Sequence, residues 1–394
     1  LQTFIQMFTG GVGGARLIIS AQYWGKGEPE PIRKLVAIGL RFSVGVGILF
    51  TLAGLLFPEE IITLFTKDAA VIAEGAVYLK WVCLSYVFFC VTQALISAMR
   101  SVEITRIGMT VSLFSLVVNI TLNYALIFGK LGLPALGIKG AAIATSLSII
   151  VGGIMALVYL LFRADTLRLV SLKMSRKSMM LALRNIGYQC KIGSSSLFGE
   201  LTLAVLILVD NLVFMHYLGD VGVGAFGIAC YYAPFFFMVG NAIAQSAQPI
   251  ISYNYGIARW AEVRKARTLL LSTSVAIGAV VALLFILIPD VLVALFVDAS
   301  SEAGQIAIAG FPYFATGIVF FILNVAIVGY YQSVEQIRRA TTFVFLRGLA
   351  LLVPCFILLP RLLGTEGIWL AMPAAEFTTL AIILASSRKR RCQK

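Results

Sequence analysis

The sequence is poor in the residues that metal and redox chemistry require. It contains one histidine and six cysteines in 394 residues, and no two cysteines form a C-x-x-C pair. A zinc site therefore cannot be assembled at the usual ligand spacings. A membrane-embedded enzyme would need a convergent set of histidines, acids or nucleophiles, which this chain does not offer. We expect neither an enzyme nor a bound cofactor.

Charged residues are also scarce. They make up 12% of the chain, and hydrophobic residues make up 60%, whereas a soluble domain carries about 25% charged residues. This balance indicates a membrane protein that contacts the lipid bilayer. The formal net charge is +13, but it does not indicate nucleic-acid binding, because the basic residues lie in short connections between apolar segments.

The apolar segments predict an all-α polytopic fold with eleven membrane helices, since a helix needs about 20 apolar residues to span a bilayer. Lys and Arg gather in alternate connections, so the positive-inside rule places those connections and the carboxyl terminus in the cytoplasm. The expected spans are 1–24, 35–58, 75–98, 107–128, 138–162, 192–218, 222–248, 268–289, 305–331, 341–360 and 367–385.

An internal repeat explains the odd number of spans. It predicts two pseudo-symmetric lobes of six helices each when complete, with the first helix absent here, and parallel halves of this kind are a known transporter plan. The expected lobes are 1–162 and 186–394, joined by a basic cytoplasmic linker, 163–185. The landmarks are Trp24-Gly25 and Tyr255-Gly256 at an offset of 231, Leu64-Phe65 and Leu295-Phe296 at 231, Ser101-Val102-Glu103 and Ser333-Val334-Glu335 at 232, and Gly137-Ile138 and Gly367-Ile368 at 230.

The span 192–218 carries two carboxylates, Glu200 and Asp210. An acid inside a membrane helix faces protein or a wet cavity and is a functional candidate. Glu200 and Asn211 share one helix face at about 100° per residue. We expect Glu200 to exchange a proton or hold Na⁺, with a hydrogen-bonded structural acid as the alternative. Asp210 lies about 15 Å farther along the axis, where a capping role is equally open.

Other polar residues form stripes on apolar helices. Asn119 and Asn123 lie one turn apart, with Thr145 within possible reach on the next helix, and they predict either an ion site or interhelical hydrogen bonds. Glu376 is a second buried acid, and Arg16 is expected to snorkel or to pair with an acid. Residues expected to line a cavity for cations are Asn211, Asn241, Gln245, Gln248, Asn324, Glu376 and the aromatic Tyr232.

Several longer motifs resemble those of the multidrug and toxic compound extrusion (MATE) family. Two of them are Asn119-Ile-Thr-Leu-Asn-Tyr-Ala-Leu-Ile-Phe-Gly129 and Leu133-Pro-Ala-Leu-Gly-Ile-Lys-Gly-Ala-Ala-Ile-Ala-Thr145. The others are Ala21-Gln-Tyr-Trp-Gly-Lys-Gly27, Gln248-Pro-Ile-Ile-Ser-Tyr-Asn-Tyr-Gly256 and Gly367-Ile-Trp-Leu-Ala-Met-Pro373, the last two being similar to a bacterial branch. The resemblance covers nearly the whole chain.

The resemblance implies a central cavity and export of amphiphilic, often cationic, compounds driven by inward proton or sodium flow. It assigns cation coupling to Glu200 and an ion contact to Asn119. Asn123 stands where many relatives have Asp, and Asp210 is the second-lobe counterpart of an acid on the missing helix. Asn324 is the only polar candidate on span 305–331, where some relatives place an acid.

The function we predict is a cation-coupled antiporter working by alternating access. We expect a monomer in the inner membrane of the cell, with H⁺ or Na⁺ as the coupling ion and any Na⁺ near Glu200 or Asn119. One alternative is a flippase for lipid-linked or peptide-like substrates. A non-transporting scaffold is a further alternative, but it would not need two buried acids.

Overall fold

The fold was obtained as a computed structural model, which describes residues 2–64, 67–130, 132–164, 166–168 and 176–389. Within these ranges, the side chains of residues 3, 176–179, 203–204, 207, 210–211, 219–221, 223, 230 and 387–389 are not described. Helices and the turns between them account for the described residues, and no strand occurs among them.

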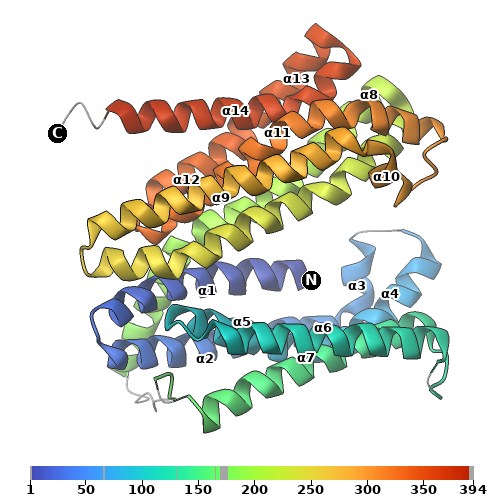
Figure 1. The fold of residues 1–394 in the computed structure, drawn as a ribbon. Helices are drawn as coiled ribbons and strands as arrows, with labels where there is room; N and C mark the ends of the chain where they lie inside the picture. Colours follow the sequence, from blue (N-terminus) through green and yellow to red (C-terminus); the bar gives the residue numbers. More distant parts are fainter. Residues whose placement is uncertain (1, 65–66, 131, 165, 169–175, 390–394) are drawn as a thin grey trace. The chain divides into compact units, whose positions relative to one another are not determined.

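The chain divides into two compact units, Leu1–Gly193 and Ser194–Lys394. In the first unit, α5 is the central helix and contacts α1, α2, α6 and α7 (Figure 1). The elements of this unit are α1 (Gln2–Gly25), α2 (Pro29–Leu56), α3 (Pro58–Thr63), α4 (Ala69–Val82), the 3₁₀ turn η1 (Cys83–Ser85), α5 (Tyr86–Ser101), α6 (Thr105–Phe128), α7 (Gly137–Phe162) and the first part of α8 (Arg176–Gly256).

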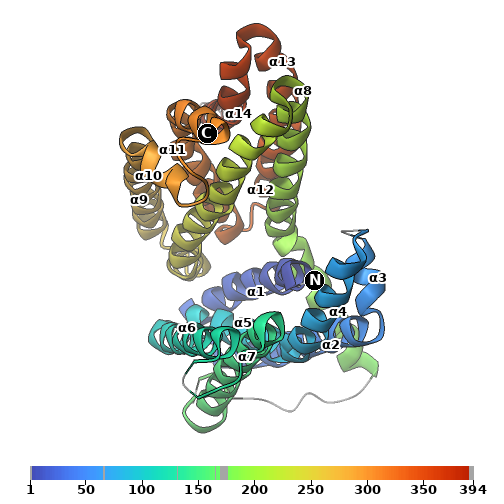
Figure 2. The same ribbon diagram turned by 90° about the vertical axis from the view of Figure 1, so that its right-hand side faces the viewer.

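In the second unit, α11 takes the central place and contacts α9, α10, α12 and α14 (Figure 2). The elements of this unit are the rest of α8, α9 (Trp260–Leu287), α10 (Pro289–Ala294), α11 (Glu302–Ser333), α12 (Ile337–Phe345), the π-helical turn η2 (Leu346–Ala350), α13 (Leu352–Leu363) and α14 (Thr365–Lys389). Gly310 and Gly317 let α14 approach α11 closely, because a Cβ at either glycine would overlap Trp369 or Pro373.

The repeat seen in the sequence recurs in the backbone. Gly27 and Ala258 both have positive φ, 73° and 56°, and so do Glu103 and Glu335, 64° and 54°. L-residues adopt positive φ rarely, so matching exceptions at the predicted offsets indicate the same turns in both units. The two units are therefore structural repeats, and the predicted fold class is confirmed.

Local sequence explains where several helices begin and end. Pro58 and Pro289 start α3 and α10 immediately after a break in the preceding helix, consistent with the missing N–H of proline at a first helical position. Asp68 caps α4 by accepting hydrogen bonds from the N–H groups of Ala70 and Val71. Gly129 ends α6 in the left-handed conformation that glycine adopts without strain.

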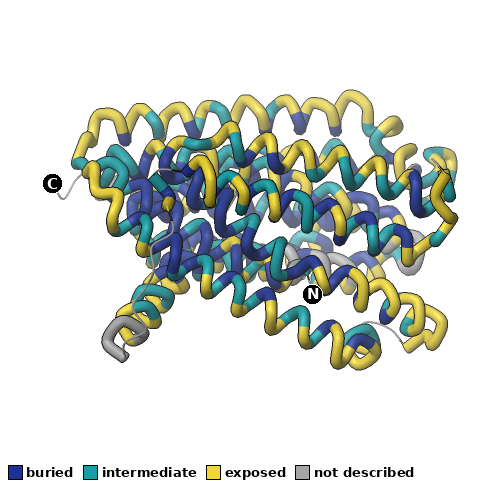
Figure 3. The backbone as a smooth tube through the Cα atoms, turned by 90° about the horizontal axis from the view of Figure 1, so that it is seen from below, coloured by how far each residue is buried: buried dark blue, intermediate teal, exposed yellow. Residues whose placement is uncertain are grey.

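The cores of the two units differ in composition. The buried cluster of the second unit is rich in aromatic rings, including Phe214, Phe236, Phe311 and Trp369. The larger buried cluster of the first unit is mainly aliphatic and includes Leu95, Met99 and Leu160. In both units, the buried residues lie on the helix faces that meet other helices, and the outer faces are exposed (Figure 3).

Among the described residues, nine helices are long and apolar enough to cross a membrane. Of the other two expected spans, the described residues 2–24 fall within α1, and 192–218 falls within α8. The expected span 341–360 differs from a regular helix, because η2 interrupts it at residues 346–350. The predicted linker remains a prediction, since residues 169–175 lie outside the described residues.

Candidate functional site

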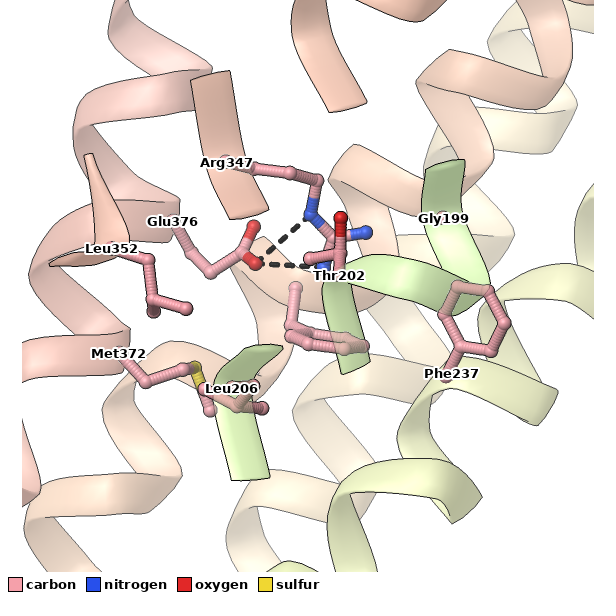
Figure 4. Close-up of a pocket in the computed structure, with 9 residues that line it drawn as sticks. Gly199, Thr202, Leu206, Phe237, Arg347, Leu352, Met372 and Glu376 are labelled. Carbon is pink, nitrogen blue, oxygen red and sulfur yellow. Dashed lines mark hydrogen bonds and ion pairs between the residues drawn. The ribbon is translucent and has the colours of Figure 1, made fainter. Parts of the chain in front are cut away.

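A buried ion pair lies in the second unit. Arg347 donates from Nε at 3.0 Å and from Nη2 at 2.7 Å to Oε1 of Glu376. The two side chains are 4% and 3% exposed. Arg347 comes from η2 and Glu376 from α14, so the pair joins two helices that the chain connects only through α13 (Figure 4).

Asn324 of α11 completes the coordination of the carboxylate. Its Nδ2 donates to Oε2 of Glu376 at 2.7 Å and to the backbone oxygen of Glu376 at 2.9 Å. The Asn324 side chain is fully buried, and its Oδ1 has no partner among the described residues. The three residues therefore tie α11, η2 and α14 together around one charged pair.

The guanidinium group also stacks on an aromatic ring. Its Cζ lies 4.3 Å from the centroid of Phe321, within the range of a cation–π contact. Phe321 and Asn324 are three residues apart on α11 and so share one helix face. The ion pair borders a cavity of about 10 Å³, close to the least volume that holds one water molecule. The cavity is lined by Gly199, Thr202, Leu206, Phe237, Phe321, Arg347, Leu352, Met372 and Glu376.

Close packing between α8 and η2 positions this site. A Cβ at Gly348 would overlap the Thr202 side chain, so only glycine allows the two elements to meet here. The π-helical turn carries Arg347 and Gly348 together. Such turns inside longer helices occur frequently at functional sites.

A second buried polar network of the second unit joins α8 to α11. Gln248 donates from Nε2 to Oε1 of Gln332 at 3.0 Å. Gln332 in turn donates to the hydroxyls of Ser195 at 2.8 Å and Ser196 at 3.0 Å. Oε1 of Gln248 is buried without a partner among the described residues.

Glu200 lies on α8 between these two groups of polar residues. It is half-buried, about one turn after Ser195 and Ser196 and two residues before Thr202. Burying a carboxylate costs less when its charge is neutralised by a proton or a bound cation. The side chains of Asp210 and Asn211 lie outside the described residues.

The first unit brings Asn119, Asn123 and Ser148 together between α6 and α7. Asn119 donates to the Ser148 hydroxyl at 3.2 Å, and Asn123 donates to Oδ1 of Asn119 at 3.0 Å. The Ser148 hydroxyl donates to the backbone oxygen of Thr145 at 2.8 Å, so Thr145 takes part through its backbone. This network contains no carboxylate, and a cation bound in it would have only neutral oxygen ligands.

The other expected cavity residues have different environments. Gln248 is buried, Asn241 is half-buried and Gln245 is exposed, so these positions on α8 do not form one equally accessible stripe. The Tyr232 hydroxyl donates to the backbone oxygen of Leu292 at 3.0 Å. No cluster of three His, Cys, Asp or Glu side chains able to hold a metal ion occurs in the described part of the chain.

The expectation that Arg16 snorkels is wrong. Its side chain is 1% exposed, and Nη2 donates to the backbone oxygen of Ala94 at 3.0 Å. Gly39 provides the space for the guanidinium, since a Cβ there would overlap it. Nε and Nη1 of Arg16 have no hydrogen-bond partner among the described residues.

Sequence reasoning missed Arg347. It identified Glu376 as a buried acid and Asn324 as a polar candidate on its helix, but it did not single out Arg347, the basic partner of Glu376. The available signal was a lone charged residue within the expected span 341–360, followed by a lone acid within the next span. Charges inside membrane segments usually pair with one another.

The fold and this site define a multi-pass helical membrane protein built from two related bundles. The sequence profile of the MatE family matches residues 1–125 and 196–357. Since this is more than half of the chain, the protein belongs to the MatE family, and the predicted resemblance is confirmed. Membership of this family of transporters also agrees with the expectation that the chain is not an enzyme.

Two curated relatives carry related names. The chain is 28% identical over 303 residues to the probable multidrug resistance protein NorM of Rhizobium meliloti, covering 75% of this chain and 63% of that protein. It is 25% identical over 343 residues to the multidrug export protein MepA of Staphylococcus saprophyticus, covering 86% and 72%. The match therefore spans less than two thirds of the first relative.

Solved structures show the same fold. The outward-facing conformation of a multidrug resistance MATE family transporter of the MOP superfamily matches with a TM-score of 0.88 at 16% identity, covering 98% of this chain and 85% of that one. A MOP superfamily transporter from Pyrococcus furiosus, described as having a binding pocket of reverse polarity, matches with a TM-score of 0.85 at 17% identity and the same coverages.

Proposed function

We propose that this protein exports amphiphilic, cationic small molecules in exchange for H⁺ or Na⁺, working by alternating access. Family membership and the names of the relatives, a multidrug resistance protein and a multidrug export protein, support export as the activity. The observation that carries the coupling is the half-buried position of Glu200 on α8, between two groups of polar residues.

Glu200 acts in this proposal as the titrating group. Protonation or Na⁺ binding neutralises its carboxylate, which lowers the cost of burying it. A state that buries Glu200 is then favoured when the ion is bound, and a state that exposes it is favoured when the ion has left. Asp210, Asn119, Asn123 and Thr145 are proposed to assist coupling, with any Na⁺ near Glu200 or Asn119.

The substrate is proposed to contact polar and aromatic side chains of the second unit. Planar cations gain from aromatic faces and from carboxylates. The proposed contact residues are Asn211, Asn241, Gln245, Gln248, Asn324, Glu376 and Tyr232. We place the protein in the inner membrane of the cell as a monomer. The distribution of Lys and Arg supports a cytoplasmic carboxyl terminus.

Transport by the reconstituted protein tests the proposal. Ethidium flux is measured in proteoliposomes with a pH gradient and a Na⁺ gradient imposed separately. We expect ethidium to move against its gradient under one of the two, which identifies the coupling ion. If ethidium flux depended on neither gradient and the protein moved a fluorescent lipid analogue between leaflets, the proposal would be overturned in favour of a flippase.

A further inference from the structure

The surroundings of the Arg347 guanidinium have the composition of a site for an organic cation. The carboxylate of Glu376 and the aromatic face of Phe321 contact it, and the buried amide of Asn324 donates to the same carboxylate. These are the groups that recognise delocalised cations in proteins, through charge, hydrogen bonds and the ring quadrupole. The cation that fills the site in this structure belongs to the protein itself.

The geometry of the pair is not the arrangement that Arg and a carboxylate form most strongly. Both hydrogen bonds from Arg347 end on the same oxygen, Oε1, and neither uses Nη1. The strongest Arg–carboxylate pairs use two parallel bonds to two oxygens. Here Oε2 instead accepts from Asn324. The carboxylate is thus held by Asn324 independently of Arg347, as a site for a separate cation requires.

In the first unit, the positions equivalent to Arg347 and Glu376 carry no charge. The landmark before Arg347, Ser333, repeats Ser101 at an offset of 232, so Ser115 is the equivalent of Arg347. The landmark before Glu376, Gly367, repeats Gly137 at an offset of 230, so Ser146 is the equivalent of Glu376. These serines donate to backbone oxygens, Ser115 to Ser148 and Ser146 to Trp81. The shared fold is therefore maintained in the first unit without an ion pair, so the pair of the second unit is not required by the architecture.

We propose that Glu376, Asn324 and Phe321 form a binding site for planar organic cations of the amidinium and guanidinium class, and that Arg347 occupies this site as a tethered competitor. A free cation binds when Arg347 swings out of the site. The apparent affinity is lowered by the fraction of molecules in which Arg347 has left the site. That such a cation is then exported rests on the proposed function, whereas its binding does not.

Removing the competitor tests this proposal with a defined sign. Benzamidinium binding is measured by isothermal titration calorimetry on the purified full chain in detergent, with neutral benzamide as the matched probe. We expect Arg347→Met to tighten benzamidinium binding at least tenfold, because Glu376 loses its internal partner. We expect Arg347→Met combined with Glu376→Gln to lose this gain, and benzamide binding to be the same in all variants.

Other results for Arg347→Met would show that Arg347 is not a competitor. Unchanged or weaker benzamidinium binding by Arg347→Met, or a gain that persists without the Glu376 carboxylate, would overturn the proposal. If Arg347→Met does not fold, Arg347→Lys keeps the charge but loses the planar group that stacks on Phe321. We expect a gain of about threefold from this weaker competitor, and no gain would also overturn it.

The assay uses no ion gradient. A failure of the proposed function would appear as absent gradient-driven ethidium flux, with benzamidinium binding intact. A failure of the cation site would leave that flux unchanged and remove only the predicted effect of Arg347 on binding. The two proposals can therefore fail separately.

Discussion

The two units share one fold but differ in the chemistry at equivalent helix pairs. Between α6 and α7, the first unit has a neutral network of Asn119, Asn123 and Ser148. Between η2 and α14, the second unit has the ion pair of Arg347 and Glu376. A hydroxyl–amide contact contributes about 1 kcal/mol between membrane helices, whereas a buried charge without its partner costs several times more.

The difference shows that duplicated architecture does not require duplicated electrostatics. Backbone turns recur at the repeat offsets, down to the positive φ of Glu103 and Glu335. The charged site and the π-helical turn that carries it occur in the second unit, while α6 of the first unit is a regular α-helix from Thr105 to Phe128. Among the described residues, the buried ion pair belongs to the second unit and the neutral Asn–Ser network to the first, so substitutions in the two units should differ in their effects.

The largest expected effect comes from removing one of the two charges of the ion pair. Arg347→Met leaves the Glu376 carboxylate buried without its counter-ion, and we expect it to lower the free energy of unfolding by about 3–5 kcal/mol. Arg347→Met combined with Glu376→Leu removes both charges and should recover most of that loss. Unfolding in mixed detergent micelles measures both variants.

An exposed pair in the first unit provides the matched control. Lys34 and Glu30 lie 3.5 Å apart, and both side chains are largely exposed. Lys34→Met should cost about 0–1 kcal/mol, because water screens such pairs. If Arg347→Met lowers the free energy of unfolding no more than Lys34→Met does, the buried ion pair is not a major contributor to stability.

The next effect concerns the packing that holds η2 against α8. Gly348→Ala introduces a methyl group that overlaps Thr202, and we expect a loss of about 1–3 kcal/mol from overpacking. In the first unit, Gly45→Ala in α2 has open space around the new methyl group and should gain up to about 1 kcal/mol from helix propensity. If thermal unfolding showed the same change in stability for Gly348→Ala and Gly45→Ala, the close contact between Gly348 and Thr202 would be contradicted.

A smaller effect is expected from the neutral network of the first unit. Asn119→Ala removes the hydrogen bonds to Ser148 and Asn123, and should cost about 1 kcal/mol. The same unfolding assay measures it, with exposed Thr121→Ala on the same helix as the control. If Asn119→Ala lowered the free energy of unfolding as much as Arg347→Met, the neutral network and the ion pair would not differ in their contribution to stability.

The smallest effect lies in the connection before α11. The backbone N–H and the hydroxyl of Ser300 both donate to Oδ1 of Asp298, and these bonds lower the pKa of Asp298. A lowered pKa stabilises the fold above the pKa of the unfolded chain, and that stabilisation is lost as the pH falls through the lowered value. Ser300→Ala keeps the backbone bond, so the Asp298 pKa should rise part of the way to its ordinary value. NMR titration of labelled aspartate tests this, and an unchanged pKa would contradict it.

Much of the fold could be predicted from the sequence because its signals are local or periodic. Apolar runs located the spans, and recurring dipeptides such as Trp24-Gly25 and Tyr255-Gly256 gave the repeat. The interruption at residues 346–350 was not predicted, since no proline lies at those positions and the close approach of Gly348 to Thr202 of α8 is a contact between distant segments.

The candidate site was only partly predictable, for a similar reason. Glu376 and Asn324 could be recognised as polar residues in apolar helices, but no sequence pattern shows that residues 52 positions apart meet at hydrogen-bonding distance. Arg16 was misread because a basic residue in a span suggests snorkelling, whereas the space left by Gly39 lets it lie inside the first unit. Contacts between distant segments, more than residue types, determine these sites.

The proposed coupling role of Glu200 is tested most directly by gradient-driven ethidium flux in proteoliposomes containing Glu200→Gln. Glu262→Gln, at an exposed position in the first turn of α9, serves as the matched control. We predict that Glu200→Gln reduces the gradient-dependent flux to that of empty vesicles while Glu262→Gln transports normally. Undiminished gradient-dependent flux by correctly inserted Glu200→Gln would contradict the account.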